Sequence, residues 1–231
     1  MGLVYKDVHE GIFRARPNRF VAEVQVHGVI ERCHIKNTGR CKEILIPGAR
    51  VYVNRSNNPN RVTKYDLFAV FKGGTLINID SQAPNRVFYE YLKSGKYISR
   101  ITKIKPEAKY GNSRFDFYVE TEDNRKIFIE VKGVTLEQEG VARFPDAPTE
   151  RGIKHLNELA ESIKQGYEAH GVFIIQMKGT SHFEPNYATH AEFGETLVRV
   201  QSQGVKITAL DCIVTANSLI IESPIPIKLL H

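Results

Sequence analysis

Short runs of alternating apolar and polar residues fill the first 80 positions of this 231-residue chain. Such alternation is typical of strands with one buried face, and Pro-Asn, His-Gly, Pro-Gly and Gly-Gly steps between the runs favour turns. Short strands this close together must close on themselves or pack as a sandwich, and we expect a small five-stranded barrel of the oligonucleotide-binding (OB) type. The predicted strands cover residues 11–16, 19–26, 29–35, 49–54, 62–71 and 75–79.

The spacing of apolar residues changes to a helical period after Ala83-Pro84. Apolar positions three and four residues apart predict a helix over 85–93 and a longer helix over 149–170. Thr149 is the expected N-cap of the longer helix, because Pro148 stops an earlier start. The buried stripe of that helix would hold Ile153, Leu156, Leu159, Ile163 and Tyr167.

Strands are expected over 99–105, 113–120, 126–132, 172–177 and 206–215, with a further helix over 191–203. The run over 172–175 is apolar on both faces, as a sheet covered by helices requires. The sequence therefore predicts an α/β (α+β) fold of two domains. A basic OB-like barrel would cover 1–82, and a mixed-sheet domain would cover 83–231.

Composition and cysteine usage narrow the class of protein. An apolar content of 42% supports ordinary globular cores, and no apolar run approaches the roughly 20 residues that span a bilayer. The first residues lack a signal-peptide pattern, so we expect a cytoplasmic protein without a membrane partner. Three cysteines without a Cys-x-x-Cys pair argue against a disulfide framework and a zinc ribbon.

The net charge of +6 is confined to the first domain. Residues 1–80 hold 13 Lys and Arg against 7 Asp and Glu, whereas residues 81–231 hold 19 of each kind. A basic module joined to a neutral one indicates a polyanion-binding surface, although a basic face kept for solubility would give the same totals. We assign DNA contacts to Arg14, Arg16, Arg19, Arg40, Arg114 and Arg151.

Two strands near the middle of the chain carry the strongest chemical signal. They cover 113–120 and 126–132, and the polar stretch between them suits a turn. In a hairpin centred on Asp123, Asp116 faces Glu130, and Lys132 lies on the same side as Glu130. Facing carboxylates with Cβ atoms about 5 Å apart repel each other, and a divalent cation would turn that repulsion into binding.

An Asp followed about a dozen residues later by Glu-x-Lys is the minimal set for metal-dependent phosphodiester cleavage. One or two Mg²⁺ (or Mn²⁺) ions would be held by Asp116, Glu130 and the main-chain carbonyl of Val131. Lys132 would hold the attacking water or the developing charge. The sequence therefore predicts a nuclease-like metal site on this hairpin.

An ordinary charged hairpin on the surface would show the same spacing. Two features favour the site. Tyr118 and Phe128 share the face of the charged residues, so this face is not simply solvated. Glu107, just upstream at the end of a strand, adds a carboxylate within expected reach of the metal.

The start of the long helix holds another cluster of polar residues. Arg151 and His155 are one turn apart on one face, and beside a metal site they would favour a phosphate. A solvated charged turn explains the same residues equally well. Gln176, which follows an apolar strand, is a candidate for orienting a water or a base.

Four strings in chain order carry a family resemblance. They lie at 37–40 (Asn-Thr-Gly-Arg), 113–117 (Ser-Arg-Phe-Asp-Phe), 130–136 (Glu-Val-Lys-Gly-Val-Thr-Leu) and 144–156, the longest. Over almost its whole length the chain resembles the sugar fermentation stimulation protein A (SfsA) family. The resemblance implies an N-terminal OB-like barrel, a C-terminal restriction-endonuclease-like PD-(D/E)XK domain, DNA binding and a regulatory link to maltose metabolism. It also implies catalytic positions for Glu107, Asp116, Glu130 and Lys132.

The leading interpretation is a DNA-binding protein without sequence specificity that carries a Mg²⁺-dependent nuclease site. The alternative is a non-catalytic DNA-binding regulator of sugar (maltose) metabolism that keeps the nuclease fold. A sugar-metabolising enzyme finds little support, because the sequence contains no phosphate-cradling glycine loop. Edge strands in the first domain leave a homodimer open.

Overall fold

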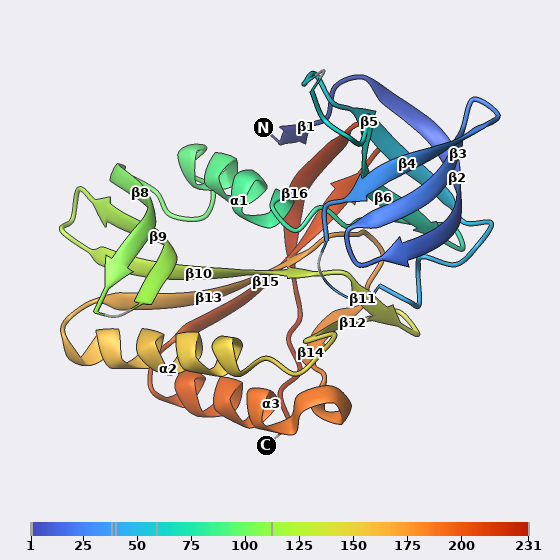
Figure 1. Ribbon diagram of the computed structural model, residues 1–231. Coiled ribbons are helices and arrows are strands. Elements are labelled where there is room, and N and C mark those ends of the chain that lie inside the picture. The colour runs from blue at the N-terminus through green and yellow to red at the C-terminus, as the bar shows by residue number, and fades with distance from the viewer. Residues whose placement is uncertain (1, 38, 40, 59, 112, 231) are drawn as a thin grey trace.

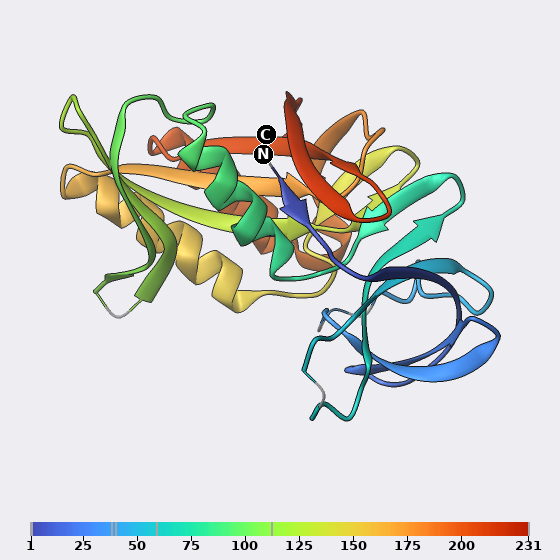
Figure 2. The ribbon, with the colours of Figure 1, turned by 90° about the horizontal axis from the view of Figure 1, so that it is seen from above.

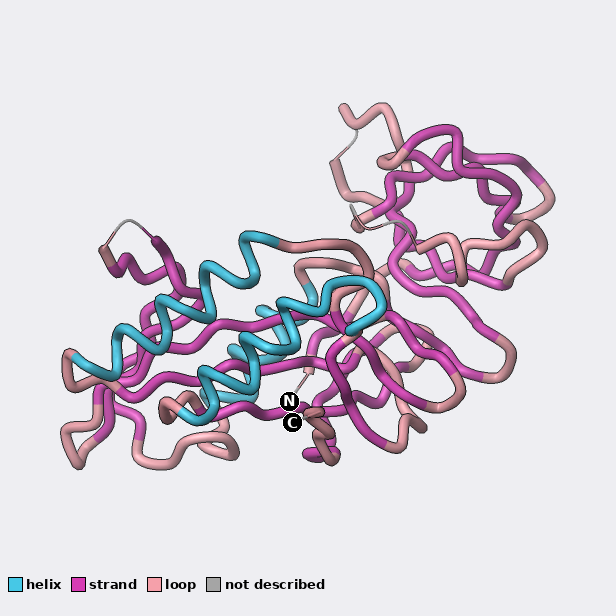
Figure 3. Tube along the Cα trace, turned by 90° about the horizontal axis from the view of Figure 1, so that it is seen from below, coloured by secondary structure: helices cyan, strands magenta, loops and turns pink. Residues whose placement is uncertain are grey.

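Five strands near the N-terminus close into a barrel (Figures 1 and 3) in the computed structural model, which describes residues 2–37, 39, 41–58, 60–111 and 113–230. Neighbouring strands run antiparallel in the order β4-β3-β2-β5-β6, and a parallel pairing of β4 with β6 closes the ring. This ring confirms the small barrel expected from the alternating pattern. Its strands are β2 (Val8–Asn18), β3 (Val21–Val26), β4 (Val29–Ile35), β5 (Arg50–Arg55) and β6 (Tyr65–Lys72).

A seven-stranded sheet forms the second body, in the order β1-β16-β15-β13-β10-β9-β8 (Figure 1). β10, β13 and β15 run parallel to one another, and the remaining neighbours are antiparallel. This mixed sheet confirms the predicted fold class. Its strands are β1 (Leu3–Val4), β8 (Ile101–Tyr110), β9 (Ser113–Thr121), β10 (Lys126–Val134), β13 (Glu168–Ile175), β15 (Lys206–Val214) and β16 (Ser218–Ile225).

β1 lies in this sheet, although its residues fall within the predicted barrel domain of 1–82. Leu3 pairs with Leu219 of β16. The ring of Tyr5 then stacks on Phe68 of β6, with centroids 3.9 Å apart. The chain thus starts in the larger body and then enters the barrel. Local periodicity does not predict this start, because it depends on a pairing between segments near opposite ends of the sequence.

Helices cover both faces of the seven-stranded sheet (Figures 1 and 2). α1 (Ala83–Lys93) packs on one face, and α2 (Glu150–Lys164) and α3 (Tyr187–Ser202) lie on the other. A strand β7 (Thr75–Asn78) extends the barrel sheet, and β11 (Leu136–Gln138), β12 (Val141–Phe144) and β14 (His182–Pro185) form a small separate sheet. Within the described residues, no helix is long and apolar enough to cross a membrane.

α2 carries the predicted apolar stripe but is shorter than the helix predicted over 149–170. It ends at Lys164, because Gly166 adopts a left-handed φ of 86° and residues from Glu168 onward form β13. The ring of Tyr167 still packs on Phe128, with centroids 4.8 Å apart. The apolar period therefore continues past the end of the helix.

Side-chain caps fix where α2 and α3 begin. Thr149 Oγ1 accepts from the amide of Gly152 at 3.1 Å, as predicted for the N-cap of α2. Asn186 caps α3, which starts before the predicted residue 191. The backbone of His190 is not helical, so a first turn precedes the segment that the sequence pattern identified.

A buried polar network joins the barrel to the larger body. Asp80 is fully buried, and one of its carboxylate oxygens lies 3.2 Å from the hydroxyl of Tyr5 and 3.3 Å from Lys36 Nζ. Gln176 Nε2 donates to Asn78 Oδ1 at 2.9 Å and to the carbonyl of Asp80 at 3.1 Å. These contacts set the orientation of the barrel against the end of β13.

Candidate active site

The hairpin of β9 and β10 has the register expected from the sequence. Ile129 pairs with Phe117, so the next position along the two strands sets Glu130 beside Asp116. β9 leaves β10 here and continues in its pairing with β8. The side chain of Asp116 lies in this fork, where its Oδ2 accepts from the amide of Val131 at 2.8 Å.

Glu130 is buried, and its two carboxylate oxygens differ in their contacts. Oε1 accepts from Lys132 Nζ at 2.6 Å and lies 2.5 Å from His155 Nδ1 on α2. Oε2 is also buried, and it has no hydrogen-bond donor among the described residues. Buried polar atoms are nearly always paired, so this oxygen is a ligand atom available to a cation.

The two carboxyls differ in how readily they ionise. Burial, reinforced by the negative charge of Glu130, raises the pKa of Asp116 to about 6. Burial also acts to raise the pKa of Glu130, but the hydrogen bond from His155 and the charge of Lys132 lower that pKa overall. Facing acids whose pKa values are driven apart are typical of functional sites.

Asn85 of α1 is part of the site, although the sequence analysis did not single it out. Its Nδ2 donates to Asp116 Oδ1 at 2.6 Å. A helix on each face of the sheet therefore supports one carboxylate, with Asn85 holding Asp116 and His155 holding Glu130. No local signal identifies Asn85, because the contact depends on how α1 packs on the sheet.

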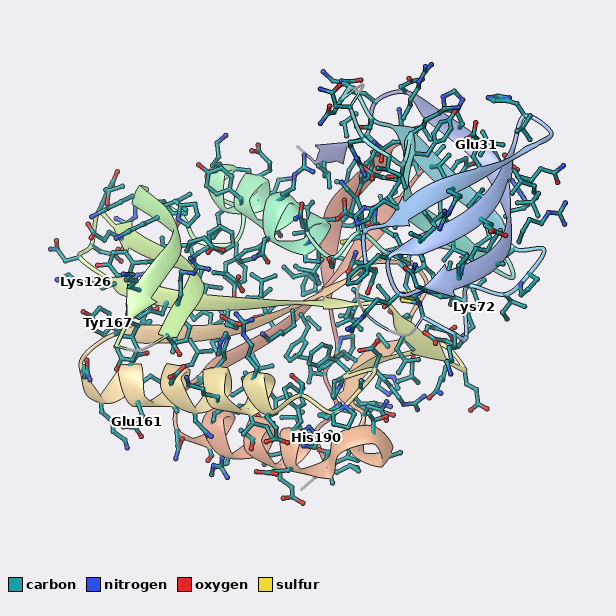
Figure 4. All side chains as sticks on the ribbon, in the orientation of Figure 1. Glu31, Lys72, Lys126, Glu161, Tyr167 and His190 are labelled. Carbon is teal, nitrogen blue, oxygen red and sulfur yellow. The ribbon has the colours of Figure 1, made fainter. Side chains whose placement is uncertain are left out.

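Aromatic rings surround the α2 side of the hairpin. The ring centroid of Phe128 lies 5.2 Å from that of Tyr118 and 4.8 Å from that of Tyr167, which Figure 4 labels near the hairpin. The ring of Phe115 lies 6.5 Å from His155. The prediction that this face is not simply solvated is confirmed, and the rings fix α2 against β10.

Glu107 stands opposite Asp116 in the register of β8 and β9. Its side chain is exposed, and its carboxylate contacts Arg114 Nε at 2.8 Å. Among its described contacts, none is with Asp116 or Glu130. The register therefore places Glu107 next to Asp116 and Glu130 (the central pair), but no described hydrogen bond or ion pair connects its carboxylate to either of them.

The arginines predicted to bind DNA differ in setting. Arg14 and Arg19 are exposed on the barrel, where Arg14 contacts the side chain of Gln25 and Arg19 lies 5.6 Å from the ring centroid of Phe20. These two side chains are accessible to a polyanion.

Arg16 and Arg40 are placed differently. One guanidinium nitrogen of Arg16 donates to the carbonyls of Arg19 at 2.9 Å and Gly39 at 3.0 Å. Arg16 thus ties two loops together and supports the barrel surface, rather than reaching freely into solvent. Arg40 lies outside the described residues.

Arg151 lies at the start of α2, beside the central pair. Its Nε is 3.4 Å from His155 Nε2, and its side chain is exposed. Gln176, in contrast, lies beyond the end of β10, where its amide donates to the carbonyl of Val134 at 2.9 Å. The buried polar network at the barrel holds its side chain, and none of its described hydrogen bonds is with Asp116, Glu130 or Lys132. That Gln176 orients a water or base stays a prediction.

A second group of potential ligand atoms lies on α2 and α3. Atoms of Glu150, His190 and Glu192 lie within 4.8 Å of one another, but both glutamates are exposed. His190 Nδ1 accepts from the amide of Thr149 at 3.2 Å, and its Nε2 lies 3.4 Å from Glu150. Both ring nitrogens of His190 thus have a protein partner, so His190 does not require a metal.

The fold and the hairpin together define a class of protein, namely an OB-type barrel joined to a nuclease-like mixed-sheet domain. The family model for the SfsA N-terminal OB domain matches residues 15–79, and the model for the sugar fermentation stimulation protein RE domain matches residues 82–218. This chain belongs to the sugar fermentation stimulation protein (SfsA) family.

Relatives match nearly the whole chain. A sugar fermentation stimulation protein homolog from Clostridium beijerinckii is 54% identical over 225 residues, covering 97% of this chain and 99% of the relative. One from Desulfitobacterium hafniense is 55% identical over 227 residues, covering 98% and 99%. A solved structure of Pyrococcus furiosus SfsA in complex with Ca²⁺ has a TM-score of 0.88 at 29% identity, covering 99% of each chain.

Proposed function

We propose that this protein binds DNA without sequence specificity and cleaves its phosphodiester bonds with Mg²⁺ or Mn²⁺ at the fork of β9 and β10. The observation that carries the proposal is the buried Oε2 of Glu130, which has no donor among the described residues and lies beside Asp116. The Pyrococcus furiosus relative was solved in complex with Ca²⁺, a cation that also prefers oxygen ligands.

The donor set fits a hard divalent cation. Glu130 and Asp116 offer carboxylate oxygens, and the carbonyl of Val131 offers another, because the amide and carbonyl of one strand residue point to the same side and the amide of Val131 faces Asp116. When bound, the metal would neutralise charge on the phosphate and lower the pKa of a bound water.

The remaining side chains have roles that follow from their contacts. Lys132 is held by Glu130 with its ammonium group at the site, where it can hold the attacking water or stabilise the developing negative charge. His155 and Asn85 orient the carboxylates of Glu130 and Asp116. Their hydrogen bonds preorganise both acids, which reduces the reorganisation required during the reaction.

The barrel supplies the main grip on the nucleic acid. OB folds bind oligonucleotides on the face of their second and third strands and on adjoining loops, which here correspond to β3, β4 and the turn at Arg19-Phe20. Phe20 is 48% exposed and offers a ring on which a base can stack. Arg19 supplies positive charge beside this ring, and Arg14 on β2 adds a further exposed positive charge to the barrel.

Cleavage assays on duplex, single-stranded and branched DNA with Mg²⁺ or Mn²⁺ test the catalytic proposal. Lys132→Gln should lower the cleavage rate by about 100-fold or more while DNA affinity stays near that of wild type, because the lysine acts on developing charge. Asp116→Ala should abolish cleavage. A wild-type protein that binds every substrate and cuts none would instead support the regulatory alternative.

A further inference from the structure

A basic cavity of about 530 Å³ lies between the tip of the β8–β9 hairpin and the first turns of α2. Two segments far apart in the sequence meet there, one ending β8 and starting β9 and the other beginning α2. The described residues that line the cavity are Lys109, Gly111, Ser113, Arg114, Arg151, Lys154 and His155.

The Lys and Arg side chains give the lining a positive charge. It includes four Lys and Arg side chains, and no Asp or Glu is among the described lining residues. Lys109 and Arg151 have no ion pair with a carboxylate in the described part of the chain. The ion pairs of Arg114 with Glu107 at 2.8 Å and of Lys154 with Glu158 at 3.8 Å lie near the surface, where such pairs contribute little and are easily exchanged for a phosphate.

His155 connects this cavity to the candidate active site. It lines the cavity and contacts Glu130 at 2.5 Å through its Nδ1, while its Nε2 faces Arg151. A group in the cavity therefore lies only one side chain away from Glu130.

The cavity and the barrel lie at opposite ends of the site. β9 leaves β10 at Asp116 and leads back to the hairpin tip with β8, whereas β10 continues from Glu130 toward the barrel (Figure 1). Seen from above and from below, the hairpin tip and the barrel project on the same side of the molecule, with α2 between them (Figures 2 and 3). One strand of nucleic acid can therefore contact both.

We propose that this cavity is a phosphate-binding subsite that holds the nucleic-acid backbone on the side of the scissile phosphate away from the barrel. The inference rests on the proposed function and specifies its substrate. The bound strand continues past the cleavage position in both directions, with the barrel binding one flank and the cavity binding the backbone of the other. Lys109 and Lys154 contact phosphate directly, and Arg114 and Arg151 complete the set.

Binding of a fluorescent single-stranded oligonucleotide in Ca²⁺, measured over a range of salt concentrations, tests this subsite without requiring cleavage. The variant Lys109→Gln/Lys154→Gln changes two exposed side chains. The control Lys96→Gln/Lys228→Gln removes the same charge at exposed positions outside the cavity lining. If each lysine contacts one phosphate, the cavity variant should bind about tenfold more weakly, and its log K versus log salt slope should fall by about 1.4. The control should stay near wild type.

A second measurement locates the phosphate. Each oligonucleotide carries one neutral methylphosphonate linkage, and the linkage is moved stepwise along the strand. At one position, we expect the neutral linkage to weaken binding by wild type but to leave binding by the cavity variant unchanged. Equal losses in the cavity and control variants, or the same methylphosphonate profile for wild type and cavity variant, would overturn the subsite. Because this readout is binding, an absence of cleavage would count against the nuclease proposal alone.

Discussion

His155 on α2 and Glu130 on β10 approach within 2.5 Å through Nδ1 and Oε1, and both side chains are buried. The apolar stripe of α2 presses the helix onto the sheet and thereby places the imidazole against the carboxylate. The packing of α2 on the sheet therefore also positions the Glu130 carboxylate, so substitutions on α2 affect the candidate active site.

Replacement of His155 by Ala should lower the free energy of unfolding by about 2 kcal/mol at neutral pH, because it removes a buried hydrogen bond to a charged group. Because the pKa of Glu130 is lowered in the folded protein, its ionisation stabilises the fold at pH values above its ordinary pKa of 4.5, and this stability is lost as the pH falls through the folded-state pKa. The difference in the free energy of unfolding between wild type and variant should therefore be full above pH 4.5 and shrink as the pH falls through the folded-state pKa of Glu130. Urea unfolding across this range measures it, and a difference that does not change with pH would contradict the assigned contact.

Asp116→Asn should stabilise the metal-free protein at neutral pH. Since the folded-state pKa of Asp116 is raised to about 6, its contribution to stability is full below the ordinary value of 3.8 and is lost as pH rises through 6. The amide cannot ionise, its oxygen can still accept from the amide of Val131, and its NH2 group can donate to the side-chain oxygen of Asn85 once that side-chain amide turns over. The variant should therefore gain about 1–3 kcal/mol above pH 6 in EDTA. Thermal unfolding against pH tests this expectation.

Wild type and Asp116→Asn also test metal binding, separately from the free-energy cost of ionising Asp116. Added Mg²⁺ or Ca²⁺ should raise the melting temperature of wild type more than that of Asp116→Asn, because a ligand that binds only the folded state stabilises it. An equal rise for both proteins would place the cation elsewhere.

Lys36→Met should destabilise the junction between barrel and sheet. Lys36 Nζ lies 3.3 Å from the fully buried Asp80 and 3.9 Å from Asp66. Asp66 keeps its ion pair with Arg61, but the loss of Lys36 leaves the buried carboxylate of Asp80 without a cationic partner among the described residues. We expect a loss of about 3 kcal/mol in the free energy of unfolding. Lys96→Met, at an exposed position, serves as the control and should lie within about 0.5 kcal/mol of wild type in the same denaturant titration.

Gly133→Ala tests the close packing at the end of β10. A Cβ atom there would lie 2.5 Å from Gln176 Oε1 and 2.7 Å from Pro84 Cγ, and the interdomain network holds Gln176 in place. Overpacking of this kind should cost about 1–3 kcal/mol. A Cβ atom added at Gly74 meets no atom of the described residues within 4 Å, so Gly74→Ala should be tolerated. A tolerated Gly133→Ala would mean that the junction can shift.

The strongest sequence predictions are those that depend on local periodicity. The register of β9 and β10 follows from alternation and a short polar turn, so the sequence alone groups Asp116, Glu130 and Lys132. The apolar stripe of α2 follows from its period, and the cap at Thr149 follows from its side-chain chemistry. The barrel follows from the density of short alternating strands.

Tertiary packing decided the remainder. Asn85 reaches Asp116 only because α1 lies across the sheet, Gln176 belongs to the junction with the barrel, and Lys109 meets Lys154 only where a hairpin tip approaches a helix. The raised pKa of Asp116 likewise depends on burial that several elements create together. Periodicity and turn chemistry act over a few residues and are written in the sequence itself. Contacts between elements depend on how their faces pack, so only the folded chain shows which side chains complete the site.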